Sequence, residues 1–199
     1  MEKMMIENNV AILTGEIVED LVFSHEVFGE GFYTMKIAVS RLSSAIDTIP
    51  VMVSDRYPVF DQLKAGSFVS VTGQYRSYNR HDAEPKLILS VFARDIFFID
   101  EPGTTNEITL AGNICKKPVL RETPLHKHVC DLLVAVNRQY EKSDYIPCIA
   151  WGRNAAFSNT LEVGDFVTMS GRIQSREYMK KEKKMTTYEV SISRISKGE

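Results

Sequence analysis

The sequence contains no long apolar run, little cysteine and only one tryptophan. No stretch of about 18 consecutive apolar residues occurs, so a membrane-spanning helix is not predicted. The first nine residues alternate charge with methionine and do not resemble a signal peptide. The three cysteines are odd in number, and each lies in or beside an apolar run: Cys115, Cys130 and Cys148. This usage predicts reduced, packed thiols in a cytoplasmic protein.

Signatures of common enzymes are also missing. The chain has no glycine-rich phosphate loop and no nucleophile beside a base, so we expect neither enzymatic activity nor a cofactor. His126, His128 and Cys130 alternate along one face, but a structural zinc site needs about four ligands and no fourth lies nearby. Cys130 also shares its parity with the apolar residues Leu132 and Val134. We therefore expect no metal site.

Charge is nearly balanced over the whole chain but uneven along it. Apolar residues make up 44% of the 199 and charged residues 25%, which is typical of a folded protein, and the net charge is −2. Residues 1–102 contain 9 Lys+Arg and 15 Asp+Glu, a net of −6, whereas residues 103–199 contain 15 and 11, a net of +4. Affinity for phosphate follows local positive charge. We therefore expect the second half to dominate any binding to nucleic acid.

The chain repeats itself, and a repeat of this kind decides the fold. One set of residues in the first half recurs 97 places later, and a second set recurs 98 places later. The first set is Asn9, Gly15, Arg41, Asp47, Pro50 and Phe60, matching Asn106, Gly112, Arg138, Asp144, Pro147 and Phe157. The second set is Leu63, Gly66, Gly73 and Ser77, matching Leu161, Gly164, Gly171 and Ser175.

Each repeat predicts a small barrel. In the second repeat we expect strands near residues 107–114, 129–137, 145–151, 166–177 and 187–195, a loop over 116–124 and a short helix over 155–161. Five strands with one helix between the third and fourth is the order of an OB-fold barrel. The predicted fold is therefore all-β: an N-terminal OB-fold domain at 1–100, a linker at 101–105 and a C-terminal OB-fold domain at 106–199. Another small five-stranded barrel without a nucleic-acid role is the alternative.

The second repeat resembles the bacterial single-stranded DNA-binding protein family over nearly its whole length. The segments that carry the resemblance are 106–112, 117–124, 134–138, 144–147, 151–155 and 171–176. The first repeat is similar mostly through the internal repeat, so the chain looks like a two-barrel variant of that family.

The resemblance implies a protein that coats and protects single-stranded DNA during replication, repair, recombination or transfer. It also implies assemblies of four barrels, which a homodimer of this chain supplies. The family commonly ends in an acidic tail that recruits other proteins, and the sequence Ser193–Glu199 shows no such tail. We therefore expect single-stranded DNA as the partner, without recruitment through a tail and without a membrane.

Strand alternation predicts which residues face outward in the second repeat. Ile146, Cys148 and Ala150 form a small apolar core face, and Val167, Met169, Gly171 and Ile173 form another. The opposite faces carry the candidate DNA-binding residues Tyr145, Trp151, Tyr178, Arg172, Gln174 and Arg176. The resemblance places Tyr145, Trp151 and Tyr178 where the family stacks bases, a contact that any base can make.

Further cations are candidates for phosphate contacts. Lys180, Lys181, Lys183 and Lys184 lie between the last two predicted strands, where an OB fold has a loop beside its binding groove. Other candidate DNA-binding residues are Arg138 and Arg153 in the second repeat, and Arg76, Tyr78 and Arg80 in the first. The repeat places Thr48 and Ser54 at the positions of Tyr145 and Trp151. We therefore expect assembly, or an extension of the DNA path, to be the main role of the first barrel.

Two other functions remain open at this point. One is an OB-fold accessory factor of replication restart or conjugation that acts mainly through protein partners. The other is an interaction scaffold without affinity for nucleic acid. Tight binding to oligo-dT, with a similar affinity for other single-stranded sequences, would favour the expected function over both.

Overall fold

The computed structural model describes residues 7–80 and 86–198, apart from the side chains of Arg80 and Lys86. The first half forms five strands and a short 3-10 helix. These are β1 (Asn9–Val27), β2 (Glu30–Ser40), β3 (Ile46–Ser54), η1 (Phe60–Gln62), β4 (Phe68–Arg80) and β5 (Lys86–Phe98).

The second half repeats this order, with one additional strand and an α-helix. Its elements are β6 (Asn106–Ile114), β7 (Val119–Glu122), β8 (His128–Asn137), β9 (Ser143–Trp151), α1 (Gly152–Ser158), β10 (Phe166–Lys180) and β11 (Lys183–Lys197).

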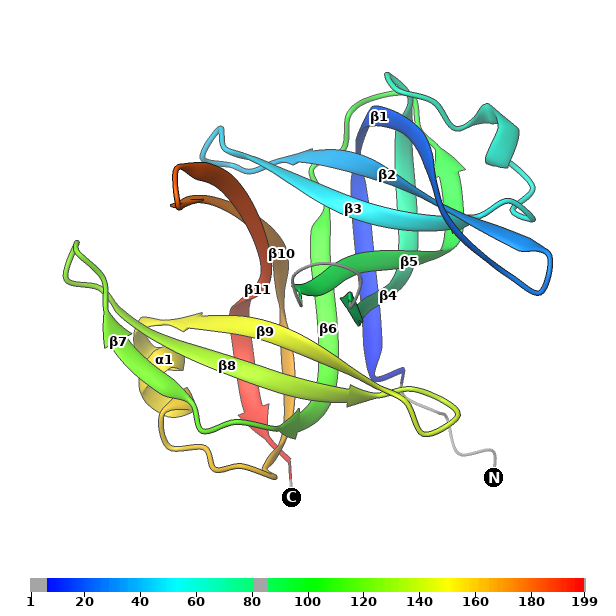
Figure 1. The fold of residues 1–199 in the computed structure, drawn as a ribbon. Helices are drawn as coiled ribbons and strands as arrows, with labels where there is room; N and C mark the ends of the chain where they lie inside the picture. Colours follow the sequence, from blue (N-terminus) through cyan, green and yellow to red (C-terminus); the bar gives the residue numbers. More distant parts are fainter. Residues whose placement is uncertain (1–6, 81–85, 199) are drawn as a thin grey trace.

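Each half closes into a barrel, and the two barrels share one continuous sheet (Figure 1). The strand order is β2-β3-β5-β4-β1 in the first barrel and β6-β10-β11-β9-β8-β7 in the second. Pairing of β2 with β1 closes the first barrel, and pairing of β6 with β8 closes the second. β1 and β6 pair antiparallel from Asn9 opposite Leu110 to Leu13 opposite Asn106. The predicted fold of two tandem OB-fold barrels is confirmed.

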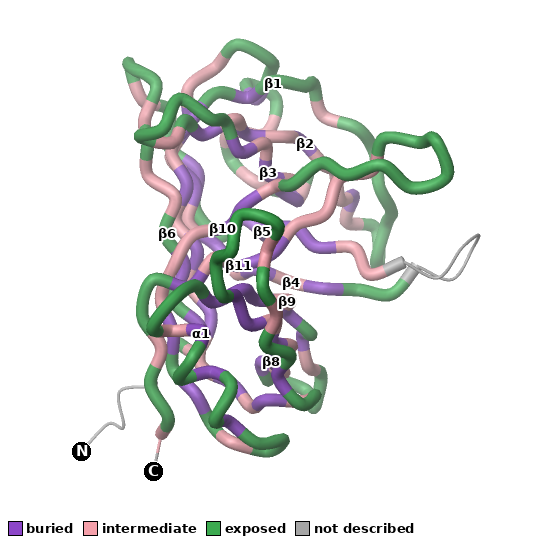
Figure 2. The backbone as a smooth tube through the Cα atoms, turned by 90° about the vertical axis from the view of Figure 1, so that its left-hand side faces the viewer, coloured by how far each residue is buried: buried purple, intermediate pink, exposed green. Residues whose placement is uncertain are grey.

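Buried residues alternate with more exposed residues along many strands, as the colours in Figure 2 show. The side chains predicted as core in the second barrel are buried, including Ile146, Ala150, Val167 and Ile173. The opposite face is exposed at Tyr145 and Trp151, as alternation predicts. Equivalent apolar side chains fill the first barrel: Leu13, Ile37, Ile49, Val71 and Val91.

Several local predictions need correction. The segment 116–124, predicted as a loop, contains β7, because residues 119–122 pair with 128–131 across the turn around His126, which has positive φ. The predicted helix at 155–161 begins earlier, at Gly152, and ends at Ser158. β10 and β11 extend further than predicted and form a long two-stranded hairpin that ends at residues 181–182; we call its outer part, residues 176–187, the β10–β11 arm.

Gly112 in β6 marks a place where two backbones approach closely. A Cβ there would lie 2.3 Å from the Ala135 carbonyl oxygen, and a Cβ on the equivalent Gly15 would lie 2.2 Å from that of Ala38. Both contacts occur where the first strand of a barrel meets the strand that closes it, β2 in the first barrel and β8 in the second. Glycine at these positions therefore allows each barrel to close.

Candidate nucleic-acid interface

The three aromatic residues predicted to stack bases are all exposed on the second barrel. Trp151 is 41% exposed at the end of β9, immediately before α1. Tyr145 is 44% exposed near the start of the same strand, and Tyr178 is 41% exposed on the β10–β11 arm. Tyr145 and Trp151 are six positions apart along an extended strand, a span of about 20 Å. The three rings thus mark an extended surface, which suits a polymer better than a compact ligand.

The candidate residues of β10 lie in different surroundings. The Gln174 side chain is buried and donates a hydrogen bond of 2.7 Å to Glu189 Oε1. The same Glu189 oxygen lies 3.7 Å from Arg176 Nε, and Arg176 is exposed. Glu189 thus contacts both Gln174 and Arg176. Because the Gln174 amide already donates a hydrogen bond to Glu189, it has little hydrogen-bonding capacity left for a ligand. Sequence reasoning missed Glu189, although its strand had been recognised as part of the repeat.

Arg172 points toward the first barrel. It lines a hollow of about 480 Å³ together with Arg41, Asp47 and Asn106. Burial lowers the pKa of Arg172, and the nearby Arg41 charge lowers it further. Of the two guanidinium groups in this hollow, that of Arg41 is already paired with the Asp47 carboxylate.

The lysine candidates cluster at the tip of the β10–β11 arm. Lys180, Lys181, Lys183 and Lys184 are all exposed, and Lys181 and Glu182 adopt positive φ in the turn. Lys184 Nζ lies 2.8 Å from Glu177 Oε2. Arg153 is exposed on α1, beside Trp151. The arm therefore presents a positively charged tip next to Tyr178.

A reciprocal set of hydrogen bonds joins the barrels; we call the residues in it the seam. Ser77 N donates to Asp144 Oδ1 at 2.7 Å, and Ser175 N donates to Asp47 Oδ1 at 3.0 Å. Tyr145 N donates to Ser77 Oγ at 2.7 Å, and Thr48 N donates to Ser175 Oγ at 3.2 Å. The residues that repeat in the sequence therefore meet across an approximate two-fold axis.

The seam also determines the surroundings of Arg138, a predicted phosphate contact. Arg138 Nε lies 2.9 Å from Asp144 Oδ2, and its Nη2 donates to the Ser77 carbonyl oxygen at 3.4 Å. Burial raises the pKa of Asp144, while the Ser77 amide and Arg138 act in the opposite direction. Arg41 holds Asp47 in the same way, with Nε donating to Oδ2 at 2.7 Å. Arg138 is therefore already engaged in a structural ion pair.

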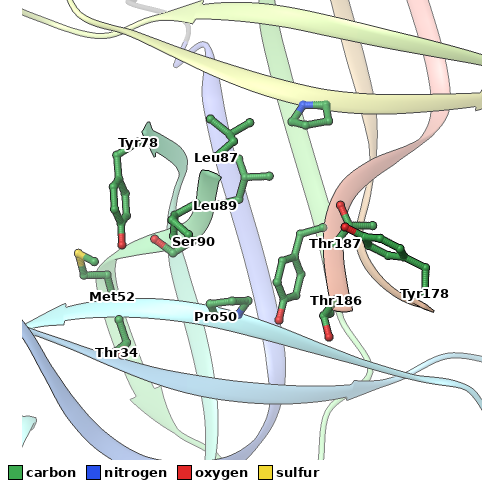
Figure 3. Close-up of a pocket in the computed structure, with 13 residues that line it drawn as sticks. Thr34, Pro50, Met52, Tyr78, Leu87, Leu89, Ser90, Tyr178, Thr186 and Thr187 are labelled. Atoms are coloured by element: carbon green, nitrogen blue, oxygen red, sulfur yellow. The ribbon is translucent and has the colours of Figure 1, made fainter. Parts of the chain in front are cut away.

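A cavity of about 340 Å³ lies between the two barrels, bordered by the β4–β5 side of the first and the β10–β11 arm of the second (Figure 3). Tyr78 stands on one side of this cavity and Tyr178 on the other. Its lining is mostly apolar and also includes Pro50, Met52, Leu87, Pro147 and Tyr188. Tyr78, which is 47% exposed, thus faces the same space as an aromatic candidate of the second barrel.

The remaining candidates of the first barrel lie on β4. The Arg76 guanidinium carbon lies 4.0 Å from the centre of the Phe92 ring, and its Nη2 donates to Gln74 Oε1 at 2.9 Å. Burial lowers the pKa of Arg76, and so does the charge of Arg138. Arg80 ends β4, and its side chain lies outside the described part of the structure.

Tyr140 was missed by the sequence reasoning. It is 90% exposed in the β8–β9 loop and has positive φ. It borders a hollow of about 630 Å³ together with Arg76, Arg94, Arg138 and Lys142. The sequence signal that could have identified Tyr140 is an aromatic residue close to charged residues in the loop 138–142.

Residues 7–80 and 86–198 contain no group of metal ligands and no membrane-spanning helix. Within them, no three His, Cys, Asp or Glu side chains are grouped as metal ligands would be. His126, one of the residues considered for a metal, is hydrogen-bonded to Glu122 instead. The cysteines in these ranges are free, and Cys130 and Cys148 are buried. No helix there has the length and apolar character needed to cross a membrane.

Known proteins match mainly the second barrel by sequence. Residues 105–197 match the Single-strand binding protein family. Single-stranded DNA-binding protein 3 of Listeria innocua is 34% identical over 80 residues, which cover 37% of this chain and 50% of that protein. Single-stranded DNA-binding protein A of Bacillus subtilis is 35% identical over 80 residues, 37% of this chain and 46% of that protein. The chain spans about half the length of these curated relatives.

A solved structure matches both barrels. The wild-type single-stranded DNA binding protein from Thermus aquaticus superposes with a TM-score of 0.78 at 23% identity, covering 96% of this chain and 93% of that one. At this identity the likeness establishes the fold. The match to the family model covers the second barrel, residues 105–197, whereas the likeness in fold covers both barrels.

Proposed function

We propose that the chain binds single-stranded DNA without sequence specificity and coats it during replication, repair, recombination or transfer. The observation that carries this proposal is the exposure of Trp151, Tyr145 and Tyr178 on a barrel of the single-strand binding protein family. Aromatic faces accept any base, and nearby cations accept the backbone, so together they give affinity that tolerates any sequence.

The residues divide into two roles in this proposal. Trp151, Tyr145 and Tyr178 stack bases, and each stacked base contributes about 1–3 kcal/mol. Arg153, Arg176 and the lysines at the tip of the β10–β11 arm neutralise phosphates. Arg138 and Gln174 act mainly by holding neighbouring residues, because each already has a protein partner. The protein acts by binding, and no residue is assigned a catalytic step.

We further propose that the chain is a two-barrel variant of the family, with units at 1–100 and 106–199, and that two copies assemble into a homodimer with four barrels. The support is the likeness of the whole chain to the Thermus aquaticus protein in fold and the match of the second barrel to the family. Light scattering at working concentration should give about twice 22.6 kDa. A particle of 22.6 kDa would contradict the dimer.

Fluorescence titration with single-stranded oligonucleotides tests the function directly. The chain has one tryptophan, so quenching of the tryptophan fluorescence on addition of DNA reports on Trp151 alone. Oligo-dT and a mixed sequence should bind with similar affinity, and binding should weaken as salt rises, with a log–log slope of about −0.7 for each phosphate neutralised. Absence of binding, or binding with no response to salt, would contradict the proposed mechanism. Weak DNA binding together with tight binding to a replication protein would favour the accessory factor instead.

A further inference from the structure

Each barrel carries a hairpin at the same place in the repeat. Residues 19–34 form the outer part of the β1–β2 hairpin, and we call this segment the acidic hairpin. Residues 116–131, which lie 97 places later, contain the β7–β8 hairpin, and we call this segment the basic hairpin. The two hairpins project from opposite sides of the molecule, so they do not meet within one chain (Figure 1).

Both hairpins have an open strand edge. Among the described residues, β1 pairs with β4 only up to Glu16, and beyond that residue it pairs with β2 alone. In the same part of the chain, β7 pairs only with β8. One side of each hairpin therefore presents backbone N–H and C=O groups that no other described strand bonds. An edge of this kind can bind a strand of another chain.

Exposed apolar side chains recur at equivalent positions of the two hairpins. Val22 is 59% exposed and its equivalent Val119 is 57% exposed. At the two turns, Phe28 is 99% exposed and its equivalent Leu125 is 78% exposed. Single exposed apolar residues are common on proteins, but these residues are apolar and exposed in both halves and lie beside an open edge. This combination is typical of a surface that contacts another protein.

The charges of the two hairpins are complementary. The acidic hairpin contains 4 Asp+Glu and no Lys or Arg, a net of −4, whereas the basic hairpin contains 4 Lys+Arg and 2 Asp+Glu, a net of +2. Glu26 is exposed two residues before Phe28, and Lys127 is exposed two residues after Leu125. Two hairpins of the same kind therefore repel each other, and two of different kinds attract each other.

We propose that the acidic hairpin of one molecule pairs edge to edge with the basic hairpin of a second copy of this chain. The open edges bond to each other, and the exposed apolar residues of the two turns, Phe28 and Leu125, become covered. Because the contact uses different surfaces on the two copies, it leaves one unoccupied hairpin at each end and joins molecules into rows. It is thus distinct from a closed homodimer, and it requires no DNA.

The size of the contact determines the conditions in which it is measured. β7 has four residues, so the paired segment is short and the contact is weak. Its charges attract most strongly at an ionic strength of about 0.01 M, where the Debye length is about 30 Å, and least at about 1 M, where it is about 3 Å. Light scattering without DNA should therefore show a mean mass that rises with protein concentration at low salt and much less at high salt.

Exchange of two charges tests whether the hairpins bind each other. Glu26→Lys and Lys127→Glu should each weaken the association about tenfold or more, because each places like charges in contact. The double variant, in which the two charges have changed places, should associate as the unchanged protein does. Glu177→Lys and Lys183→Glu make the same changes of charge on the β10–β11 arm and should have little effect. Thermal unfolding checks that every variant is folded.

Cysteine cross-linking tests the head-to-tail arrangement. Val22→Cys and Val119→Cys are prepared in a Cys115→Ala background, because Cys130 and Cys148 are buried. Under mild oxidation a mixture of the two variants should form a two-chain disulfide, and neither variant alone should do so. Val163→Cys, at a position that is 60% exposed outside both hairpins, replaces either partner as the control and should not cross-link.

Three results would overturn the contact between hairpins. They are a mean mass that does not depend on concentration at low salt, a double variant that associates no better than the single ones, and cross-linking of one variant alone as strong as that of the mixture. Neither measurement uses DNA, so each of these results would leave the proposed function intact. Conversely, failure of the protein to bind single-stranded DNA would not affect the contact.

Discussion

The outer strand pair of the first barrel carries Phe32 opposite Ser54, whereas the equivalent pair of the second carries Val129 opposite Trp151. The seam shows the reverse behaviour, since Asp47 and Asp144 make the same contact with Ser175 and Ser77. The repeat therefore preserves the residues that join the barrels and changes the residues that we propose to contact DNA. Visible repetition in this sequence marks assembly, and binding has to be sought where the two halves differ.

The largest expected effect concerns the part in which the barrels are alike. Asp144→Ala leaves Arg138 without its carboxylate and the Ser77 amide without its acceptor, and Asp47→Ala does the same to Arg41 and Ser175. Removing one partner of a buried ion pair costs about 3 kcal/mol. Both variants should therefore lose about this much free energy of unfolding in urea.

Glu177→Ala is the control for the seam, because Glu177 belongs to an exposed ion pair with Lys184. Such pairs contribute about 0–1 kcal/mol. If Asp47→Ala and Asp144→Ala differed strongly, the two sides of the seam would not be equivalent, and the comparison between the barrels would need revision.

The next effect concerns the aromatic difference. Trp151→Ala should weaken binding to single-stranded DNA by about 1–3 kcal/mol, because it removes a stacking surface without opening the core. Ser54→Ala changes the equivalent position of the first barrel and should leave affinity nearly unaltered. Filter binding or anisotropy measures both variants, since the first has no tryptophan to report binding. Equal affinity of folded Trp151→Ala and the unchanged protein would exclude Trp151 as a base-stacking residue.

The smallest effect concerns charge. Replacing Lys180, Lys181, Lys183 and Lys184 with glutamine should reduce the steepness of the salt dependence by about 0.7 for each lysine that contacts a phosphate. Lys64→Gln removes an exposed lysine from the acidic first barrel and should not change the slope. An unchanged slope after replacement of all four lysines would assign the tip of the β10–β11 arm to the solvent.

The sequence was sufficient to predict the barrels, because alternation and an internal repeat are local patterns. Tyr145, Trp151 and Tyr178 are exposed as parity and resemblance predict. The partners of Gln174 and Arg138 were not predicted, because both depend on the register of a hairpin. Glu189 pairs directly with Gln174 in the β10–β11 hairpin, and Asp144 lies across the β8–β9 hairpin from Arg138.

The neighbouring rings of His25, Phe32 and Phe92 in the first barrel escaped prediction for a related reason. They come from three strands, Phe92 is distant in sequence from the other two, and a comparison of equivalent positions finds only Thr48 and Ser54. Register shifts in β1 between Ile17 and His25 also interrupt the alternation on which face assignment depends. Sequence reasoning assigned the outward face of the regular second barrel and missed this group of rings in the first, where the strands are irregular.

The pairing of β1 with β6 has a consequence for any attempt to study the barrels apart. Each isolated half would expose an unpaired strand edge. It would also expose an aspartate that, in the whole chain, accepts a hydrogen bond from a backbone amide of the other half. The connection at residues 101–105 then serves as a tether that keeps complementary surfaces at an effective concentration of about millimolar. A chain cleaved at this connection should remain a two-fragment complex, and two separately produced halves should recognise each other when mixed.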